Sequence, residues 1–407
     1  MKIAYLCQYY IPEPSAPSAR ISEFSKQWVL DGHQVTVITG MPNHPNGSIL
    51  KQYKGKLTVD ENIDGVCVLR NWLYATPNRG VIKKTISHLS FMVSTVLLSL
   101  HRLNKIDILI ASSPTFFSAF AGLFISRIRK VPFVFEVRDL WPAIFVELGI
   151  LQHPFLIKIL ELLEMFLYSN ADLIVTVTNS FRDRLIERGI ESGKIIVIFN
   201  GAMVSIYRPG SKDRALVEEL SLEDKFVVSY IGSHGISQGV NTIVNAAEIL
   251  RLRSNIDFLL VGDGAMKKSI GQTIIDKKLS NVKMLPPQSK DLIPDFYRIS
   301  DVCIVPLKNI SLFDSFVPSK IFEIMACGIP IIASVVGEAK EILQRSQSAK
   351  IISPESAVEL VTAIEWMFDN HQERSKMAES GRMFVCDHYD RSILAKNYMN
   401  HLRSIVL

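Results

Sequence analysis

The run IAYLCQYYIPEPSAPSARISEFSKQWVLDGHQVTVIT, residues 3–39, decides the fold. It opens with an apolar strand over 3–7, passes through a loop rich in Pro, Ser and Ala, and then has the apolar spacing of a helix over 18–31. Gly32 ends that helix, and a β-branched strand follows over 35–39. Strand, helix and strand in this order predict a βαβ unit, which requires a parallel sheet.

The same alternation recurs along the chain. Before residue 200 we expect further strands at 106–111, 133–137, 173–178 and 195–199, and helices at 116–129, 156–169 and 180–188. The turn-rich stretch 200–211 interrupts the pattern. It then restarts, with strands at 226–231, 257–261, 282–285, 302–306 and 329–334 and helices at 241–253, 292–299 and 320–325.

A chain of 407 residues is too long for one ordinary core. We therefore predict an α/β protein of two Rossmann-like, doubly wound domains, over 1–203 and 204–385. A last helix within 386–407 completes the second domain or returns to the first. Ligands bind at the carboxyl ends of parallel strands, so we expect both sheets to face a central cleft.

Composition narrows the function. With 48% hydrophobic and 21% charged residues and a net charge of +5, the chain is typical of a globular protein and not of one that binds nucleic acid. Its five cysteines form no C-x-x-C pair, which favours a reducing, cytoplasmic setting over a disulfide framework. We expect no signal peptide, and the apolar run 89–100 is too short to span a bilayer.

Three loops after predicted strands contain small residues. Residues 8–20 stand where a dinucleotide-binding protein has G-x-G-x-x-G, so a plain NAD site is not predicted, and the loop is equally well a rigid connector or a ligand contact. Gly232 and Ser233 follow one strand of the second domain, and Gly262 and Gly264 follow the next. Their backbone N–H groups could cradle a phosphate, although a simple glycine turn is the alternative.

The segment EVRDLWP, residues 136–142, follows another strand. Asp139 could act as a base or orient a hydroxyl, and Arg138 could hold a phosphate. The alternative, of equal weight, is an internal charge pair of Arg138 with Asp139 or Glu136, with Trp141 as packing.

The segment DSFVPSKIFEIMACGIPIIASVVG, residues 314–337, carries the strongest signal. Pro318 and Ser319 are typical of a helix start, which places Lys320 in the first turn. A cation there opposes the helix dipole, so it indicates an anion nearby. Glu323 lies at i+3 on the same face and could accept hydrogen bonds from sugar or ribose hydroxyls. A surface Lys–Glu pair is the weaker alternative.

With these residues, the chain resembles the retaining glycosyltransferases of family four, which have the GT-B fold. The likeness covers nearly the whole chain and rests on GHQVTVIT at 32–39, VGDG at 261–264, SDVCIVP at 300–306 and EIMACGIPIIAS at 323–334. EVRDLWP at 136–142 with VPSKIFE at 317–323 is most similar to bacterial transferases of O-antigen and capsule gene clusters, described as L-fucosamine (N-acetyl-L-fucosaminyl) transferases.

The resemblance implies a role for individual residues. Glu323 binds the ribose, Lys320 neutralises the diphosphate, and Asp139 faces the sugar. Backbone groups around Phe316, Val317 and Ser319 hold the phosphates, and the loop 284–288, with Pro287, flanks the base. Catalysis is thus assigned to Asp139, Lys320 and Glu323, without a cofactor or metal.

Three departures from the family pattern stand out. Ser315 occupies the place of the family's first glutamate, His234 and Gln238 replace its Arg and Lys, and 16–19 replace its Gly-Gly loop. Lys320, helped by Arg138 or Arg20, is then left to balance the leaving diphosphate.

The resemblance also implies the partners: a nucleotide-sugar donor, UDP-linked by likeness to the fucosamine transferases, and a lipid-linked or growing surface-polysaccharide acceptor. The basic and apolar segment 81–105 could rest on the cytoplasmic face of the inner membrane, although an amphipathic core helix is slightly favoured. A sugar-nucleotide epimerase and an inactive sugar-nucleotide-binding subunit are the rival hypotheses.

Overall fold

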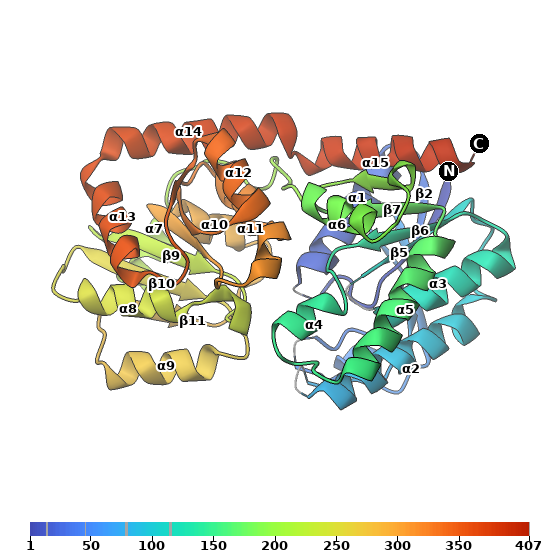
Figure 1. Cartoon of the computed structure of the whole chain (residues 1–407). Helices are drawn as coiled ribbons and strands as arrows, with labels where there is room; N and C mark the ends of the chain where they lie inside the picture. The colour runs from blue at the N-terminus through green and yellow to red at the C-terminus, as the bar shows by residue number, and fades with distance from the viewer. Residues whose placement is uncertain (14, 45, 78–79, 114–115, 407) are drawn as a thin grey trace. The chain divides into compact units, whose positions relative to one another are not determined.

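The computed structural model describes residues 1–13, 15–44, 46–77, 80–113 and 116–406. Pro14, in the loop predicted after the first strand, lies outside them. The chain forms two compact units: the N-terminal unit comprises 1–199 and 391–407, and the C-terminal unit comprises 200–390. Each unit contains one sheet covered by helices (Figure 1).

The sheet of the N-terminal unit has eight strands in the order β3-β4-β2-β1-β5-β6-β7-β8. The antiparallel β3–β4 hairpin forms one end, and the remaining neighbours are parallel. The strands are β1 Lys2–Leu6, β2 Gln34–Gly40, β3 Thr58–Ile63, β4 Val66–Asn71, β5 Ile108–Ser112, β6 Phe133–Val137, β7 Leu173–Thr176 and β8 Ile195–Val197. The predicted β1–helix–β2 unit is confirmed.

Helices cover both faces of this sheet. On one face, α1 (Ala16–Leu30) packs against α15 (Arg391–Val406); on the other, α2 (Val81–Ser99), α3 (Phe116–Arg129) and α5 (Pro154–Asn170) lie side by side (Figure 1). The shorter helices are α4 (Ala143–Glu147), α6 (Asn179–Glu187) and the 3-10 turns η1 (Lys51–Tyr53) and η2 (Ser192–Lys194).

The last helix, α15, belongs to the N-terminal unit because α1 anchors it. The indole Nε1 of Trp28, on α1, donates a hydrogen bond to the carbonyl of Ala395 at 2.9 Å, and Trp28 is fully buried. Phe24 and Tyr398 pack around the same indole, and Glu23 pairs with Arg391. Deleting a buried aromatic of this kind costs about 3–5 kcal/mol, so these contacts fix the end of the chain firmly.

The C-terminal unit has a wholly parallel sheet in the order β11-β10-β9-β12-β13-β14. The strands are β9 Phe226–Ile231, β10 Ile256–Val261, β11 Val282–Leu285, β12 Val302–Pro306, β13 Ile331–Ser334 and β14 Ala349–Ile351. The helices are α7 Arg214–Glu219, α8 Asn241–Ile249, α9 Lys267–Asp276, α10 Ile293–Arg298, α11 Lys320–Ala326, α12 Gly337–Ser346, α13 Ala357–Asp369 and α14 His371–His388, with 3-10 turns η3 Ile236–Gln238 and η4 Ser311–Ser315.

Two differences from the sequence prediction have clear physical causes. Helix α8 stops at Ile249 instead of 253, since Leu252 and its neighbours are exposed and bury no apolar face. The β3–β4 hairpin was not predicted, although Asp64-Gly65 carried the signal for it. Both residues have positive φ, 53° and 81°, which is the backbone of a tight two-residue hairpin turn.

Candidate functional site

The loops after β9 and β10 pack against each other through glycine. Gly232 has φ 146° and Gly262 has φ 148°. A Cβ on Gly262 would lie 1.9 Å from the carbonyl oxygen of Gly232, and a Cβ on Gly232 would lie 2.4 Å from Nζ of Lys320. Glycine is therefore required for the two loops and the lysine to approach so closely.

Lys320, the first residue of α11, presents an unneutralised cation at this edge. Its Nζ lies 4.0 Å from the centroid of the Tyr230 ring and makes no hydrogen bond or ion pair with any residue that the structure describes. Burial lowers the pKa of Lys320 to about 8, and the charge of Glu323 opposes the shift. An ammonium held by an aromatic ring alone is free to bind an anion.

Glu323 lies one turn along α11 and is half-buried. The hydroxyl of Tyr297 donates a hydrogen bond to its Oε2 at 3.4 Å. Within the described part of the chain, no ion pair joins Lys320 to Glu323, so the surface-pair alternative is not observed. The carboxylate can accept a hydrogen bond from a ligand hydroxyl.

His234 is fully buried and connects the two glycine loops. The backbone N–H of His234 donates to the carbonyl of Asp263 at 2.8 Å, and the backbone carbonyl of His234 accepts from the backbone N–H of Met266 at 2.9 Å. Burial and the charges of Lys267 and Lys320 lower the imidazole pKa to about 4. The ring is therefore neutral near pH 7 and does not supply the positive charge of an arginine.

The other residues predicted to bind the donor lie in the loops that follow β9, β10 and β11 and in the segment before α11. Ser233 is exposed and accepts a hydrogen bond from Tyr230 through its carbonyl, while Gly264 abuts the backbone of His234. Pro287 is exposed just after β11. Phe316 and Val317 lie between η4 and α11, which begins at Lys320; Val317 is buried, and the ring centroids of Phe313 and Phe316 are 5.5 Å apart.

The N-terminus of helix α11 contributes less to anion binding than the sequence suggests. It has only seven residues, and Ser319 makes no side-chain capping bond. The macrodipole of so short a helix is small, so the argument for an anion now rests on the Lys320 side chain and not on the helix terminus.

The N-terminal unit has a contrasting cluster at the end of β6. Glu136 is fully buried and accepts hydrogen bonds from Arg20 Nε at 3.1 Å and from the hydroxyls of Tyr5 and Ser112, each at 2.7 Å. Burial alone would raise the pKa of Glu136, but these partners and the nearby charge of Arg138 outweigh it and lower that pKa.

This cluster corrects two sequence hypotheses. Arg20 also donates to the carbonyls of Ile198 and Phe199, so each nitrogen of its buried guanidinium makes a hydrogen bond inside the protein and the group is not available for a diphosphate. Glu136 takes Arg20 as its ion-pair partner instead of Arg138, because the start of α1 brings Arg20 to the end of β6.

Asp139 follows this cluster in the N-terminal unit and is half-buried. Burial raises its pKa to about 6, and the charge of Arg138 opposes the shift. Trp141 stacks on Phe116, with ring centroids 4.9 Å apart. A carboxyl group with a pKa of about 6 can exchange a proton near neutral pH.

A further polar cluster in the N-terminal unit was not identified from the sequence. Glu13, which is 4% exposed, accepts N–H bonds from Tyr10, Asn43 and His44, and burial, offset by those bonds, raises its pKa to about 7. His88, on α2, lies 2.7 Å from Oε1 of Gln8. The loop 8–20 did hint at a ligand contact, but its partners come from residues 30 to 80 positions away.

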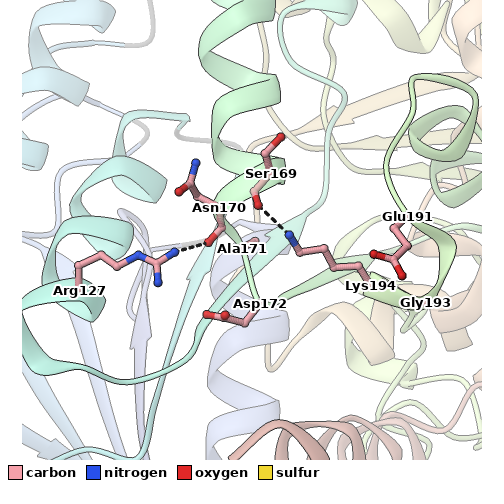
Figure 2. A pocket seen from close by; sticks show the side chains of 8 residues that line it. All are labelled: Arg127, Ser169, Asn170, Ala171, Asp172, Glu191, Gly193 and Lys194. Carbon is pink, nitrogen blue, oxygen red and sulfur yellow. Dashed lines mark hydrogen bonds between the residues drawn. The ribbon is translucent and has the colours of Figure 1, made fainter.

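Figure 2 shows a depression of about 410 Å³ at the opposite edge of the N-terminal sheet. Its lining residues come from the end of α3 and from the segments just before β7 and β8: Arg127, Ser169, Asn170, Ala171, Asp172, Glu191, Gly193 and Lys194. Arg127 and Lys194 reach the carbonyls of Asn170 and Ser169 (Figure 2). No predicted site residue lies here, and ligands of such sheets bind at the carboxyl edge.

In the described ranges, no three His, Cys, Asp or Glu side chains are grouped to hold a metal ion. Likewise, none of the described helices is both long and apolar enough to cross a membrane.

Comparisons with known proteins agree with this architecture. Residues 15–201 match the family described as glycosyl transferase 4-like domain, and residues 211–384 match glycosyl transferases group 1. WcaI of Escherichia coli (strain K12), named as a colanic acid biosynthesis glycosyl transferase, is 26% identical over 374 residues, covering 89% of this chain and 91% of WcaI. A lipopolysaccharide 1,2-N-acetylglucosaminetransferase of Salmonella typhimurium is 25% identical over 57% of this chain and 62% of its own.

Solved structures give the fold. HepE of Anabaena, in complex with UDP and glucose, superposes with a TM-score of 0.72 at 19% identity and covers 99% of this chain and 100% of its own. Sucrose-phosphate synthase of Thermosynechococcus elongatus gives a TM-score of 0.76 at 17% identity, over 99% and 98% of the two chains. With family matches on both halves, this chain is a glycosyltransferase with the GT-B fold and belongs to the group 1 transferases of retaining family four.

Proposed function

We propose that this enzyme transfers a sugar from a UDP-linked donor to a lipid-linked or growing surface polysaccharide. The uncompensated ammonium of Lys320 carries the proposal. It lies beside the glycine loops of the C-terminal sheet, where an incoming diphosphate would supply the missing negative charge.

In this proposal each residue of the donor site has one task. Lys320 stabilises the charge that grows on the departing diphosphate. The N–H groups of Gly232 and Gly262 already donate to the carbonyls of Val261 and Leu285, and that of Gly264 donates to Asp263, so the phosphate cradle expected from these glycines is not assigned to them. Glu323 accepts hydrogen bonds from the ribose, and Asp139, in the N-terminal unit, contacts the transferred sugar. The UDP assignment is supported by HepE, whose solved complexes contain UDP, UDP and glucose, or UDP-glucose.

The acceptor assignment is supported by the named relatives. WcaI is named for colanic acid biosynthesis and the Salmonella relative for transfer to lipopolysaccharide, both of them surface glycans. We assign acceptor recognition to the polar cluster of Gln8, Glu13, His44 and His88 in the N-terminal unit. The sugar itself, N-acetyl-L-fucosamine by the sequence likeness, is the most specific part of the proposal.

Ser315 bears on the inactive-subunit alternative. Its side chain is buried and donates to the carbonyl of Leu312 at 2.7 Å, so no carboxylate stands at that position. Family membership on both halves nevertheless favours a transferase over an epimerase or an inactive subunit.

The proposal is tested by nucleotide binding and turnover. Ligand that binds only the folded state raises its melting temperature. UDP, but not GDP, ADP, CMP or dTDP, is expected to raise it, and Glu323→Ala is expected to remove the effect while Glu341→Ala, on the exposed side of α12, keeps it. Acceptor-dependent release of UDP from UDP-sugars then identifies the donor. A shift with UDP but no release with any donor would contradict transfer.

A further inference from the structure

The outer surface of α2 carries an apolar stripe. Its exposed side chains recur at intervals of three or four positions and so lie on one side of the helix: Ile82, Ile86, Leu89, Val93 and Leu97. Ile82 is 77% exposed and Leu97 is 65% exposed. The sequence slightly favoured an amphipathic core helix in this segment, and the structure shows α2 with one side in the core and this apolar stripe exposed on the other.

Helix α5 carries a second stripe of the same kind. Its exposed apolar residues are Phe155, Leu156, Ile159, Leu162 and Phe166, with Phe155 70% and Leu162 62% exposed. The sequence predicted this helix but not its exposed apolar side, since a crossover helix on a parallel sheet ordinarily buries its apolar side.

Helix α3 lies between α2 and α5 and joins the two stripes (Figure 1). It exposes Phe124 and Ile128, and its Phe120 ring stacks on Phe166 of α5 with centroids 6.4 Å apart. The three stripes therefore form one continuous surface, here called the outer apolar face. Monomeric proteins rarely expose so large an apolar area unless it binds something.

The charges around this face indicate what binds. Helices α2 and α3 contain no Asp or Glu. Lys83, Lys158, Arg127 and Lys130 are exposed at the ends and margins of the stripes, against one exposed acid on α5, Glu161. Glu164 is buried and paired with Arg188 at 2.7 Å, so it adds no charge to the surface.

We propose that the outer apolar face docks on the surface of an anionic lipid membrane. Apolar side chains enter the boundary between headgroups and acyl chains, and the basic margin meets the anionic headgroups. A second copy of the chain fits less well, since a symmetric contact would bring two basic margins together. Docking does not depend on the transfer reaction, so the two proposals can fail separately.

Vesicle flotation without donor or acceptor tests the proposal. The full chain is expected to float with vesicles of phosphatidylcholine and phosphatidylglycerol, and less with pure phosphatidylcholine. Leu162→Glu and Leu97→Glu should each lower the partition coefficient about tenfold or more, the loss expected for one apolar side chain. Leu252→Glu, at an 89% exposed leucine of the C-terminal unit, is the matched control and should change nothing.

Three results would overturn docking. The first is wild-type protein that stays out of anionic vesicles, and the second is a Leu252→Glu variant that loses binding as fully as Leu162→Glu. The third is a stable wild-type dimer in sedimentation that Leu162→Glu converts to monomer, because the face would then be an interface between copies. Urea unfolding followed by the fluorescence of Trp28, Trp72 and Trp141 shows, without any ligand, that the N-terminal unit of each α2 or α5 variant is folded.

Discussion

Each unit has a cation at the carboxyl edge of its sheet, but one of these cations is paired and the other has no acceptor. In the N-terminal unit, each nitrogen of the Arg20 guanidinium makes a hydrogen bond, with Glu136 as its ion-pair partner and two backbone carbonyls as acceptors. In the C-terminal unit, Lys320 rests on the ring of Tyr230 and finds no acceptor among the residues described. A buried cation that is paired and hydrogen-bonded through each of its nitrogens holds a fold together, whereas one without an acceptor is available to a ligand.

The largest expected effect follows from breaking the buried ion pair of Arg20 with Glu136. Glu136→Ala leaves Arg20 buried without a counter-charge and should destabilise the N-terminal unit by about 3–5 kcal/mol. Urea unfolding followed by tryptophan fluorescence can measure this, because Trp28, Trp72 and Trp141 belong to that unit and only Trp366 to the other. Lys26→Ala is the control: its pair with Asp64 is about half exposed, so its loss should cost less than about 1 kcal/mol.

Removing the Lys320 ammonium should lower activity without lowering stability, the opposite of what is expected for Glu136→Ala. Lys320→Ala should lower kcat/KM about 100- to 1000-fold, since it removes charge stabilisation of the leaving diphosphate. Its melting temperature should stay the same or rise, because the variant loses only the contact with the Tyr230 ring and no longer buries a charge. Lys268→Ala, at an exposed position on α9, should leave both values unchanged. A Lys320→Ala enzyme within about threefold of wild-type activity would exclude the assigned role.

Glu323→Gln tests the acceptor beside Lys320 with a smaller expected effect. The amide keeps the shape but removes the charge, so UDP should bind about tenfold or more weakly, as expected for a hydrogen bond to a carboxylate. Isothermal titration with UDP measures the loss, and Glu341→Gln on α12 serves as the matched control. Equal affinity in the two variants would show that Glu323 does not contact the nucleotide.

The smallest effect is a pH dependence of UDP binding. The pKa of Lys320 is lowered to about 8, so its ammonium is charged below that pH and loses its proton as pH rises through it. UDP affinity should therefore be highest near neutral pH and fall several-fold between about pH 7 and about pH 9.5. Titration calorimetry across this range should show the decline in the wild type and a flat profile in Lys320→Ala. A decline of equal size in that variant would assign the titration to another group.

Much of the fold was predictable because both sheets are built from local repeats. Nearly continuous apolar runs flanked by turn signals marked β1, β6 and β9, and the 3.6-residue spacing marked α3 with the bounds Phe116–Arg129 that the structure shows. The predictions that were wrong concern ends of elements, and the β3–β4 hairpin and the helices α9, α12, α13 and α14 were not predicted. The end of α8 is one example, since it depends on which residues a neighbour buries.

Parts of the candidate site could also be predicted. Lys320 stood out as a cation in a first helical turn, and Gly232 and Gly262 as glycines after strands. The roles of Arg20 and Glu13 could not, because all their partners except Tyr10 lie 30 to 179 positions away along the chain. A sequence pattern gives the type of a residue but not which distant carboxylate, carbonyl or N–H will satisfy it.

The sequence by itself determined the α/β class, the two-part organisation and the family likeness, because each depends on short-range periodicity and contiguous motifs. Tertiary structure decided which charges are neutralised and which helix sides remain exposed. It paired Arg20 with Glu136, left Lys320 over Tyr230, and set three apolar stripes side by side on α2, α3 and α5. Burial and electrostatic pairing depend on packing between distant segments, and this is why only the folded chain separates a structural cation from a binding one.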